Sequence, residues 1–561
     1  MAFQLSPGVN VSEIDLTTIV PSVATSIGAF AGPFAWGPIG EIITISDEVR
    51  LADTFGKPDS TNYEYWFSAA NFLAYTSNLK IVRAANTAST RNATANGTAI
   101  LIKNNDDWLD NHTGYADGAY NGFVARYAGE IGNTLKVSMA DANTYATWSY
   151  STQFTSTPGT STYVSNKGGA NDEIHIVVID EDGLFSGTRG TILEKFPFAS
   201  KASDAKDDAG NTNYYKNVIR NKSKYIHWVS HTTTVATSGT AWGSAANNTS
   251  FKHLTANVTV SLSGGVDGTI STANVISAYD FFDPAESVDI SLVVGGPATA
   301  TVATDLISMA ETRKDCVVFL SPLKTNVVDN AGNETTDIKT FRDSLTSTSY
   351  AVLDSNWKYQ YDKYNDVYRW VPLNGDVAGL CARTDLERDP WFSPGGLNRG
   401  IIKNSIKLAW NPTKTNRDDL YVKGINPIVT FQGEGTVLFG DKTLLSKPSA
   451  FDRINVRRLF IVLEKAIARA ARFSMFEFND QFTRAQFVAL VEPFLRDVQG
   501  RRGITDFRVV CDETNNTGEV IDRNEFIGDI YIKPARSINF IQLNFVAVRT
   551  GVSFDEVVGK F

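Results

Sequence analysis

The sequence has few of the residues that build catalytic or metal centres. Its 561 residues include only three cysteines and five histidines. Cys316, Cys381 and Cys511 lie far apart, and all the histidines fall between residues 112 and 253. This inventory disfavours a disulfide framework, a structural zinc site and histidine-based catalysis in the rest of the chain. We therefore expect no catalytic, cofactor-binding or metal-binding residues and no enzyme activity.

Positive charge and long apolar runs are also scarce. Lys and Arg number 52 against 61 Asp and Glu, so the net charge is -9, which is unfavourable for broad binding to nucleic acid or anionic lipid. The most apolar helical stretch, residues 459–463, is followed at once by Glu464 and Lys465, well short of the roughly 20 residues that cross a bilayer. Residues 1–8 contain no Lys or Arg, so a secretory signal is not indicated. We expect no direct nucleic-acid binding and no membrane insertion.

Apolar residues are abundant enough for several cores. Hydrophobic residues make up 42% of the chain and charged residues 20%, which is typical of a folded protein, and the length predicts two to four domains. Composition changes along the chain predict a multidomain α+β and α/β protein. We expect an extended N-terminal arm (1–22), an incomplete N-terminal part of a core (23–85), a β-rich Ser/Thr/Asn-rich insertion of one or two surface domains (86–265), an α/β domain (266–450), an α+β domain (451–550) and a C-terminal arm (551–561).

Local patterns predict the elements of these domains. Residues 27–32 and 79–82 are typical of buried strands, and residues 62–75 carry aromatics at helical spacing. Between residues 273 and 353, apolar strands at 288–294, 316–320 and 350–353 alternate with helices near 273–282, 302–312 and 337–345, a pattern typical of parallel βαβ units. A hairpin is expected at 357–371, long helices at 451–474 and 479–499, and strands at 507–511, 527–532 and 538–548.

Three motifs resemble ligand sites but fit simpler structures better. The run GTVLFGDKT at residues 435–443 has Asp441 where a phosphate loop has its lysine, so a strand and turn are expected. His227 and His231 are four residues apart, but their surroundings have strand composition, which favours solvated loop or strand histidines. Residues 204–211 lack the ligand spacing of a calcium loop, and we expect an exposed acidic turn there.

One helix carries a regular set of positive charges. Arg458, Lys465, Arg469 and Arg472 are spaced by seven, four and three residues, which places them in one narrow stripe at 100° per residue. Such a stripe is either an ordinary solvated face or a surface that meets an acidic partner.

The chain resembles the tail sheath proteins of contractile-tailed bacteriophages, particularly the T-even-like group. The residues that carry the resemblance are GTVLFGDKTL (435–444), INVRRLFI (454–461), FEFND (476–480) and VCDETNNT (510–517), together with SPGVNVSEID (6–15) and IGAFAG (27–32) ahead of WGP (36–38). They occur near both ends of the chain, whereas residues 86–265 contribute little.

The resemblance implies a virion subunit that assembles in the host cytoplasm. Such subunits form hexameric rings stacked around a tail tube, and the sheath contracts to drive the tube into the host envelope. The implied partners are further copies, the tail tube protein, and baseplate and tail terminator proteins. In the family, both arms add strands to a sheet in the C-terminal domain of neighbouring subunits, and that domain faces the tube while the insertions face outward.

Residues of this chain can be placed in those roles. Short alternating stretches at Val9, Val11 and Ile14 and at Val552 and Phe554 are the expected arm strands. The alternation of Ile541, Leu543 and Phe545 with polar residues predicts a strand that accepts them. The basic stripe is the hypothetical tube contact.

Two other classes of function are compatible with parts of the sequence. The Thr/Asn-rich middle is compatible with a surface adhesin or another virion structural protein. An α/β enzyme built on residues 273–353 fits less well, since no acid, base and nucleophile set converges in the sequence.

Overall fold

The computed structural model describes residues 23–116, 118–231, 241–539 and 542. The chain divides into two compact units. The first unit spans Val20–Phe473, and the described residues of the second unit begin at Ser474. Both contain helices and strands, which agrees with a multidomain α+β protein.

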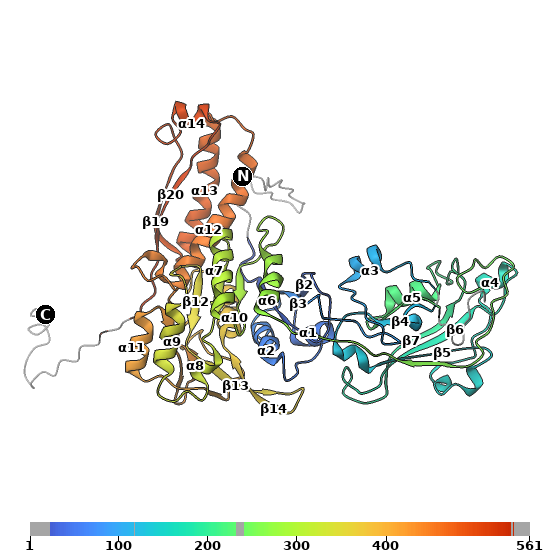
Figure 1. The fold of residues 1–561 in the computed structure, drawn as a ribbon. Helices are drawn as coiled ribbons and strands as arrows, with labels where there is room; N and C mark the ends of the chain where they lie inside the picture. The colour runs from blue at the N-terminus through green and yellow to red at the C-terminus, as the bar shows by residue number, and fades with distance from the viewer. Residues whose placement is uncertain (1–22, 117, 232–240, 540–541, 543–561) are drawn as a thin grey trace, which may run out of the picture. The chain divides into compact units, whose positions relative to one another are not determined.

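A seven-stranded sheet forms the centre of the first unit (Figure 1). Its order is β16-β12-β11-β10-β1-β3-β2, and all neighbours are parallel except β2 and β3. The strands are β1 (Gly28–Pro33), β2 (Ile43–Ile45), β3 (Leu79–Ala84), β10 (Leu292–Val294), β11 (Val317–Leu320), β12 (Ala351–Asp354) and β16 (Ile425–Asn426). Gly28 lies opposite Leu79 on one side and Leu292 on the other. The strands β1, β2 and β3 therefore belong to the same sheet as strands that come more than 200 residues later in the chain.

Helices cover both faces of this sheet because its strands are apolar on both sides. In β1, Phe30 packs in one core cluster with Trp66 and Leu380, whereas Ala29 packs in another with Leu306. The helices of the unit outside residues 86–265 are α1 (Glu48–Phe55), α2 (Tyr63–Leu73), α6 (Thr272–Tyr279), α7 (Ala300–Arg313), α8 (Lys324–Val327), α9 (Glu334–Asp343), α10 (Asn374–Glu387), α11 (Lys414–Val422) and α12 (Ile454–Ala471). The βαβ prediction is confirmed, although β10 is shorter than the strand expected at 288–294.

Two small antiparallel sheets accompany the main sheet. The first has the order β14-β13-β15, with β13 (Trp357–Asp362) and β14 (Val367–Pro372) forming the predicted hairpin beside β15 (Lys407–Leu408). The second pairs β17 (Ile428–Phe431) with β18 (Gly435–Leu438), so the glycine-rich run is a strand and turn as expected.

The middle of the chain is β-rich. Its four-stranded antiparallel sheet has the order β7-β6-β5-β9, and a separate pair joins β4 and β8. The elements are β4 (Phe123–Ala125), β5 (Leu135–Asp141), β6 (Glu173–Asp180), β7 (Thr191–Ser200), β8 (Ile226–Trp228) and β9 (Val258–Ser261), with helices α3 (Asn105–Asn111), α4 (Thr162–Asn166) and α5 (Tyr215–Lys222). Trp36 joins the core of this region, where its ring lies 5.4 Å from Tyr127 and 5.1 Å from Phe185.

The second unit is a small α+β structure. It contains α13 (Gln481–Gly500), β19 (Ile504–Val510), α14 (Gly518–Asp522) and β20 (Asp529–Pro534), and β19 pairs antiparallel with β20. The predicted helix at 479–499 and strands at 507–511 and 527–532 are confirmed with slightly different bounds. The strand predicted at 538–548 falls mostly outside the described residues.

Candidate functional site

The basic residues of α12 are the first candidate site. The helix forms from strong helix formers such as Leu, Ala, Arg and Glu, and its apolar side chains, including Ile454 and Ile461, pack in a core cluster of the first unit. Arg458, Lys465 and Arg469 lie in α12, whereas Arg472 begins the 3-10 turn that follows it (Arg472–Ser474). These four side chains, however, do not form one exposed charged surface.

Arg458 is buried inside the protein, with 4% of its side chain exposed. Its guanidinium lies 2.5 Å from an Asp385 carboxylate oxygen of α10 and donates a hydrogen bond to the Cys381 carbonyl at 3.2 Å. Burial raises the pKa of Asp385, and the charge of Arg458 opposes that effect. The expectation that Arg458 belongs to an exposed stripe is therefore wrong, because this charge is neutralised within the subunit.

Lys465 is also engaged within the first unit. Its ammonium donates to an Asp289 carboxylate oxygen at 2.5 Å and to the Ile290 carbonyl at 2.9 Å, just before β10 begins. Arg469 lies 3.6 Å from the same Asp289 and stays 45% exposed, whereas Arg472 is exposed just after the end of the helix. Only the C-terminal half of the stripe is thus open to a partner.

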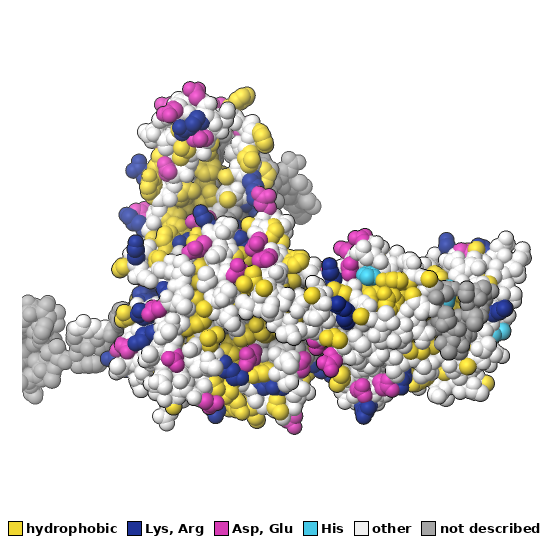
Figure 2. Space-filling model, viewed as in Figure 1, with side chains coloured by type: hydrophobic (Ala, Val, Ile, Leu, Met, Phe, Trp, Pro, Cys, Tyr) yellow, Lys and Arg dark blue, Asp and Glu magenta, His cyan; other side chains and the backbone are white. Residues whose placement is uncertain are grey.

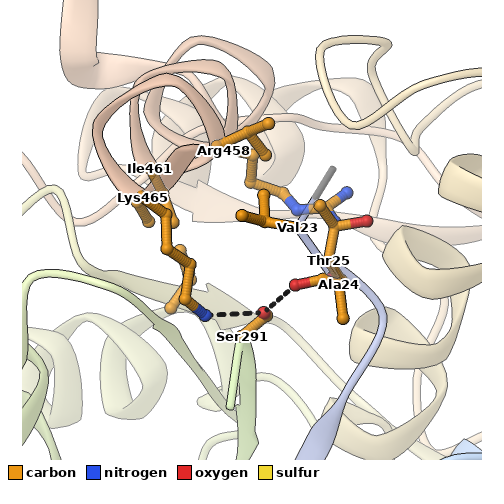
Figure 3. A pocket seen from close by; sticks show the side chains of 9 residues that line it. Val23, Ala24, Thr25, Ser291, Arg458, Ile461 and Lys465 are labelled. Atoms are coloured by element: carbon orange, nitrogen blue, oxygen red, sulfur yellow. Dashed lines mark hydrogen bonds between the residues drawn. The ribbon is translucent and has the colours of Figure 1, made fainter. Parts of the chain in front are cut away.

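The N-terminal segment enters the first unit beside these two basic residues. Val23, Ala24 and Thr25 line a small cavity together with Arg458, Ile461 and Lys465 (Figure 3). The Ser291 hydroxyl donates to the Ala24 carbonyl at 3.0 Å and lies 3.5 Å from the Lys465 ammonium. The cavity volume is ≈ 10 Å³, about that of one water molecule, so it is a packing seam between α12 and the entering chain.

The predicted arm and acceptor residues cannot be placed. Val9, Val11, Ile14, Val552 and Phe554 lie outside the described residues, as do Ile541, Leu543 and Phe545. What the structure does describe nearby in the sequence is the β19–β20 pair of the second unit. Within the described residues, these two strands pair only with each other.

Large apolar side chains are exposed at the start of the second unit. Phe476, Phe478 and Phe482 are 102%, 84% and 76% exposed, and Met475 is 59% exposed. Figure 2 shows hydrophobic side chains gathered over α13 and β20. Isolated exposed apolar residues are common, but a contiguous group marks an interaction surface. In the sequence, residues 476–480 carry only the family resemblance. The alternation of Phe476 and Phe478 with Glu477 and Asn479 is the signal from which this exposure could have been predicted.

The other sequence motifs have structural explanations. His227 lies in β8, but it is buried and not solvated, because Trp108 stacks on it at 4.1 Å. This burial lowers the pKa of His227 to about 3. Asp207 accepts hydrogen bonds from the Ala209 and Asn211 backbone amides at 3.1 and 2.8 Å, which confirms an exposed acidic turn.

The part of the chain that the structure describes also bears on metal binding, thiol reactivity and membrane insertion. No group of three or more His, Cys, Asp or Glu side chains there is arranged to hold a metal ion. Burial raises the pKa of both Cys316 and Cys381 to about 12, so neither thiol is activated. Among these same residues, no helix has the length and apolar character needed to span a membrane.

Comparison with known proteins identifies the family. The family model described as the phage tail sheath protein central domain matches residues 268–444, and that of the phage tail sheath C-terminal domain matches residues 446–547. The tail sheath protein of Enterobacteria phage T4 is 33% identical over 99% of this chain and 99% of its own length. The chain belongs to the phage tail sheath protein family.

A second relative and one solved structure are also similar to the chain. The tail sheath protein of Vibrio phage KVP40 is 33% identical, over 99% of this sheath protein and 100% of its own length. The helical sheath of the anti-feeding prophage, solved in its contracted state, has a similar fold with a TM-score of 0.52 at 13% identity, over 97% of this chain and 99% of that one.

The boundary between the two family models differs from the boundary between the two compact units of this sheath protein. The C-terminal model begins at residue 446 and so includes α12, whereas α12 packs with the first unit and the second begins at Ser474. The central model begins at residue 268, directly after the β-rich middle. That middle therefore interrupts the sheath core between β3 and β10.

Proposed function

We propose that this chain is the structural subunit of a contractile tail sheath, which polymerises as stacked hexameric rings around a tail tube and contracts to drive the tube through the host envelope. Family membership supports this function, as does the similarity to a relative solved as a contracted helical sheath. The subunit would be part of the virion, assembled in the host cytoplasm, with tube, baseplate and terminator proteins as partners.

The observation that carries the proposal is the two-stranded sheet that the described residues of the second unit form. Among the described residues this sheet has only β19 and β20, and a two-stranded sheet is marginally stable by itself. Open edges expose unpaired backbone groups that pair readily with another chain. The exposed Phe476, Phe478 and Phe482 add apolar surface that a neighbour would cover.

The strands that complete this sheet would come from the arms of neighbouring subunits. Val9, Val11 and Ile14 at one end and Val552 and Phe554 at the other belong to short alternating stretches suited to strand addition. Ile541, Leu543 and Phe545, which closely follow β20 in sequence, would extend the accepting sheet. Because a donating arm and an accepting edge are different surfaces, the contact is heterologous and generates an open helical polymer.

The junction around α12 would keep each arm attached to a fixed point on its own subunit. The entering residues 23–25 lie beside Arg458 and Lys465, which are tied to Asp385 and Asp289. Contraction would then rotate whole bodies between two packings while the arms keep their pairing. Arg469 and Arg472 stay candidates for contact with the tube, since both remain exposed.

Truncation of the C-terminal arm tests the assembly mechanism. The chain lacking residues 551–561 should keep the thermal unfolding transition of the full chain but form no tubes in electron micrographs. The matched control replaces residues 551–561 by a Gly/Ser segment of equal length, which keeps the length and removes the alternating side chains. Normal tubes from either variant would refute strand addition by this arm.

A further inference from the structure

The small sheet β14-β13-β15 has an unusual distribution of side chains. Its inward face carries Lys358, Gln360 and Asp362, which are 0%, 4% and 0% exposed. Its outward face carries the cross-strand pairs Tyr359–Trp370 and Tyr361–Tyr368. An antiparallel sheet with one solvated face normally has the opposite arrangement, with apolar residues inward and polar residues outward.

Each inward polar residue has a hydrogen-bond or ion-pair partner. The Lys358 ammonium donates to an Asp376 carboxylate oxygen at 2.9 Å, and Gln360 accepts from the Asn71 amide at 2.9 Å. Asp362 accepts from the Arg369 guanidinium at 2.8 Å. These contacts fix the polar face of the sheet toward the protein interior, and the aromatic side chains therefore lie on the opposite, outward face.

The outward residues form a continuous aromatic face. The ring centroids of Tyr359 and Trp370 are 4.7 Å apart, and those of Tyr361 and Tyr368 are 5.3 Å apart. Tyr361 and Tyr368 are 47% and 54% exposed. Figure 2 shows hydrophobic side chains over β13 and β14 at the bottom of the view. Exposed tyrosines and tryptophans in contact with each other are typical of interface centres.

One positive charge lies on this face. The ammonium of Lys407, an exposed residue of β15, is 5.0 Å from the Tyr359 ring centroid and 5.5 Å from that of Trp370. Asp366, between β13 and β14, accepts a hydrogen bond from the Tyr361 hydroxyl at 2.7 Å and keeps its negative charge, so the positive charge of the face lies at Lys407. The face therefore suits a partner with an exposed apolar group next to negative charge.

The same chain carries such a surface on another part of its first unit. Asp280 and Asp283 are exposed, Asp305 is half-buried, and Phe281 beside them is 44% exposed. Partial burial raises the pKa of Asp305, and the charges of Asp280 and Asp283 raise it further. Asp280 follows α6, which packs against α7, the helix that carries Asp305. Arg313, whose charge acts on Asp283, forms an ion pair with Asp315 at 2.9 Å.

We propose that the aromatic face of β13, β14 and β15 docks onto the surface around Asp280, Phe281 and Asp305 of a second copy of this chain. The contact rests on the sheath assembly proposed above and adds a body-to-body interface to its arms. The two surfaces differ, so the contact is heterologous and extends into a helical array. Lys407 would approach the acidic group while Tyr361 and Tyr368 cover Phe281.

Charge exchange between the two surfaces tests the contact in the full-length chain. Lys407→Glu alone, and Asp280→Lys with Asp305→Lys, should each raise the critical concentration for polymerisation about tenfold, because like charges then face each other. The chain with all three changes should return to within about threefold of the wild-type value. Light scattering and electron microscopy measure polymerisation, and thermal unfolding confirms the fold.

A second pair of variants tests the aromatic side chains. Tyr361→Ser with Tyr368→Ser should raise the critical concentration about tenfold, whereas Tyr361→Phe with Tyr368→Phe keeps the rings and should assemble as the wild type does. Unchanged assembly of the Ser variant, or no recovery in the charge-exchanged chain, would overturn this contact. If such variants assembled normally but lost binding to a glycan, the face would be a glycan site. Failure of the wild-type chain to polymerise would instead contradict the sheath assembly itself.

Discussion

Arg458 of α12 and Asp385 of α10 form an ion pair of 2.5 Å in which each side chain is 4% exposed. The pair joins a helix from the end of the first unit to a helix that covers its central sheet. The Thr25 carbonyl lies 3.5 Å from the same guanidinium. Three segments far apart in the sequence thus meet at one buried charge.

Breaking this pair should destabilise the subunit strongly. We expect Asp385→Ala to lower the free energy of unfolding by about 3 to 5 kcal/mol, because it leaves a buried guanidinium without its counter-charge. Chemical denaturation measures the change. The control is Arg469→Ala on α12, the helix that carries Arg458; its pair with Asp289 is 3.6 Å long and partly exposed, and its loss should cost less than about 1 kcal/mol. Equal effects of the two changes would contradict the proposed anchoring role of Arg458.

Asp354 should make stability depend on pH. Burial raises the pKa of this carboxyl to about 8, although the Ser321 hydroxyl donates to it at 2.6 Å. The folded state therefore holds a proton that the unfolded state releases near pH 4, so this contribution to stability is lost as the pH rises from about 4 to 8. Replacing Asp354 by Asn should flatten that dependence and stabilise the protein at pH 8. Asp343→Asn, at a residue with a 56% exposed side chain, is the control and should leave the dependence unchanged.

Gly375 should tolerate no side chain. A Cβ atom at this position of α10 would lie 2.2 Å from the Ser68 carbonyl oxygen of α2, so the two helices would have to separate. We expect Gly375→Ala to lower the free energy of unfolding by about 3 kcal/mol. Gly500→Ala in α13, where a Cβ meets no atom within 4 Å, should be neutral or slightly stabilising. A neutral Gly375→Ala would show that the helix contact is looser than the structure describes.

The β-rich middle should be removable from the sheath core. Its entering and leaving segments meet where the Thr94 and Ser263 amides donate to each other's carbonyls at 2.8 and 2.9 Å. Joining Thr94 to Ser263 through Asn-Gly should therefore leave a core that unfolds cooperatively. The stability should fall by about 2 kcal/mol, since Trp36 loses its packing against Tyr127 and Phe185.

A substitution at Trp36 tests whether the lost ring packing accounts for this decrease in stability. In the full chain Trp36→Ala should destabilise by about 3 kcal/mol or more. In the shortened chain the same change should have little effect, because the partners of the ring are gone. A shortened chain that shows no cooperative transition would contradict an independent core.

The sequence by itself determined the type and order of most elements. Apolar strands alternating with amphipathic helices after residue 272 predict the parallel sheet because side-chain periodicity reports which faces are buried. The hairpin at 357–371 follows from local pattern for the same reason, and the family follows from the runs near both ends. The domain bounds and the roles of the arms stay predictions.

Tertiary structure alone decided what individual side chains do. Helical spacing places Arg458, Lys465, Arg469 and Arg472 on one stripe, but it contains no information on which residues lie opposite. Asp385 and Asp289 come from distant segments, and only their approach in space turns Arg458 and Lys465 into internal ties while Arg469 and Arg472 remain exposed. The outward aromatic face of β13 and β14 could not be predicted from the sequence for the same reason. Alternation in a strand does not show which of its two faces is covered. Here the partners of Lys358, Gln360 and Asp362 decide it.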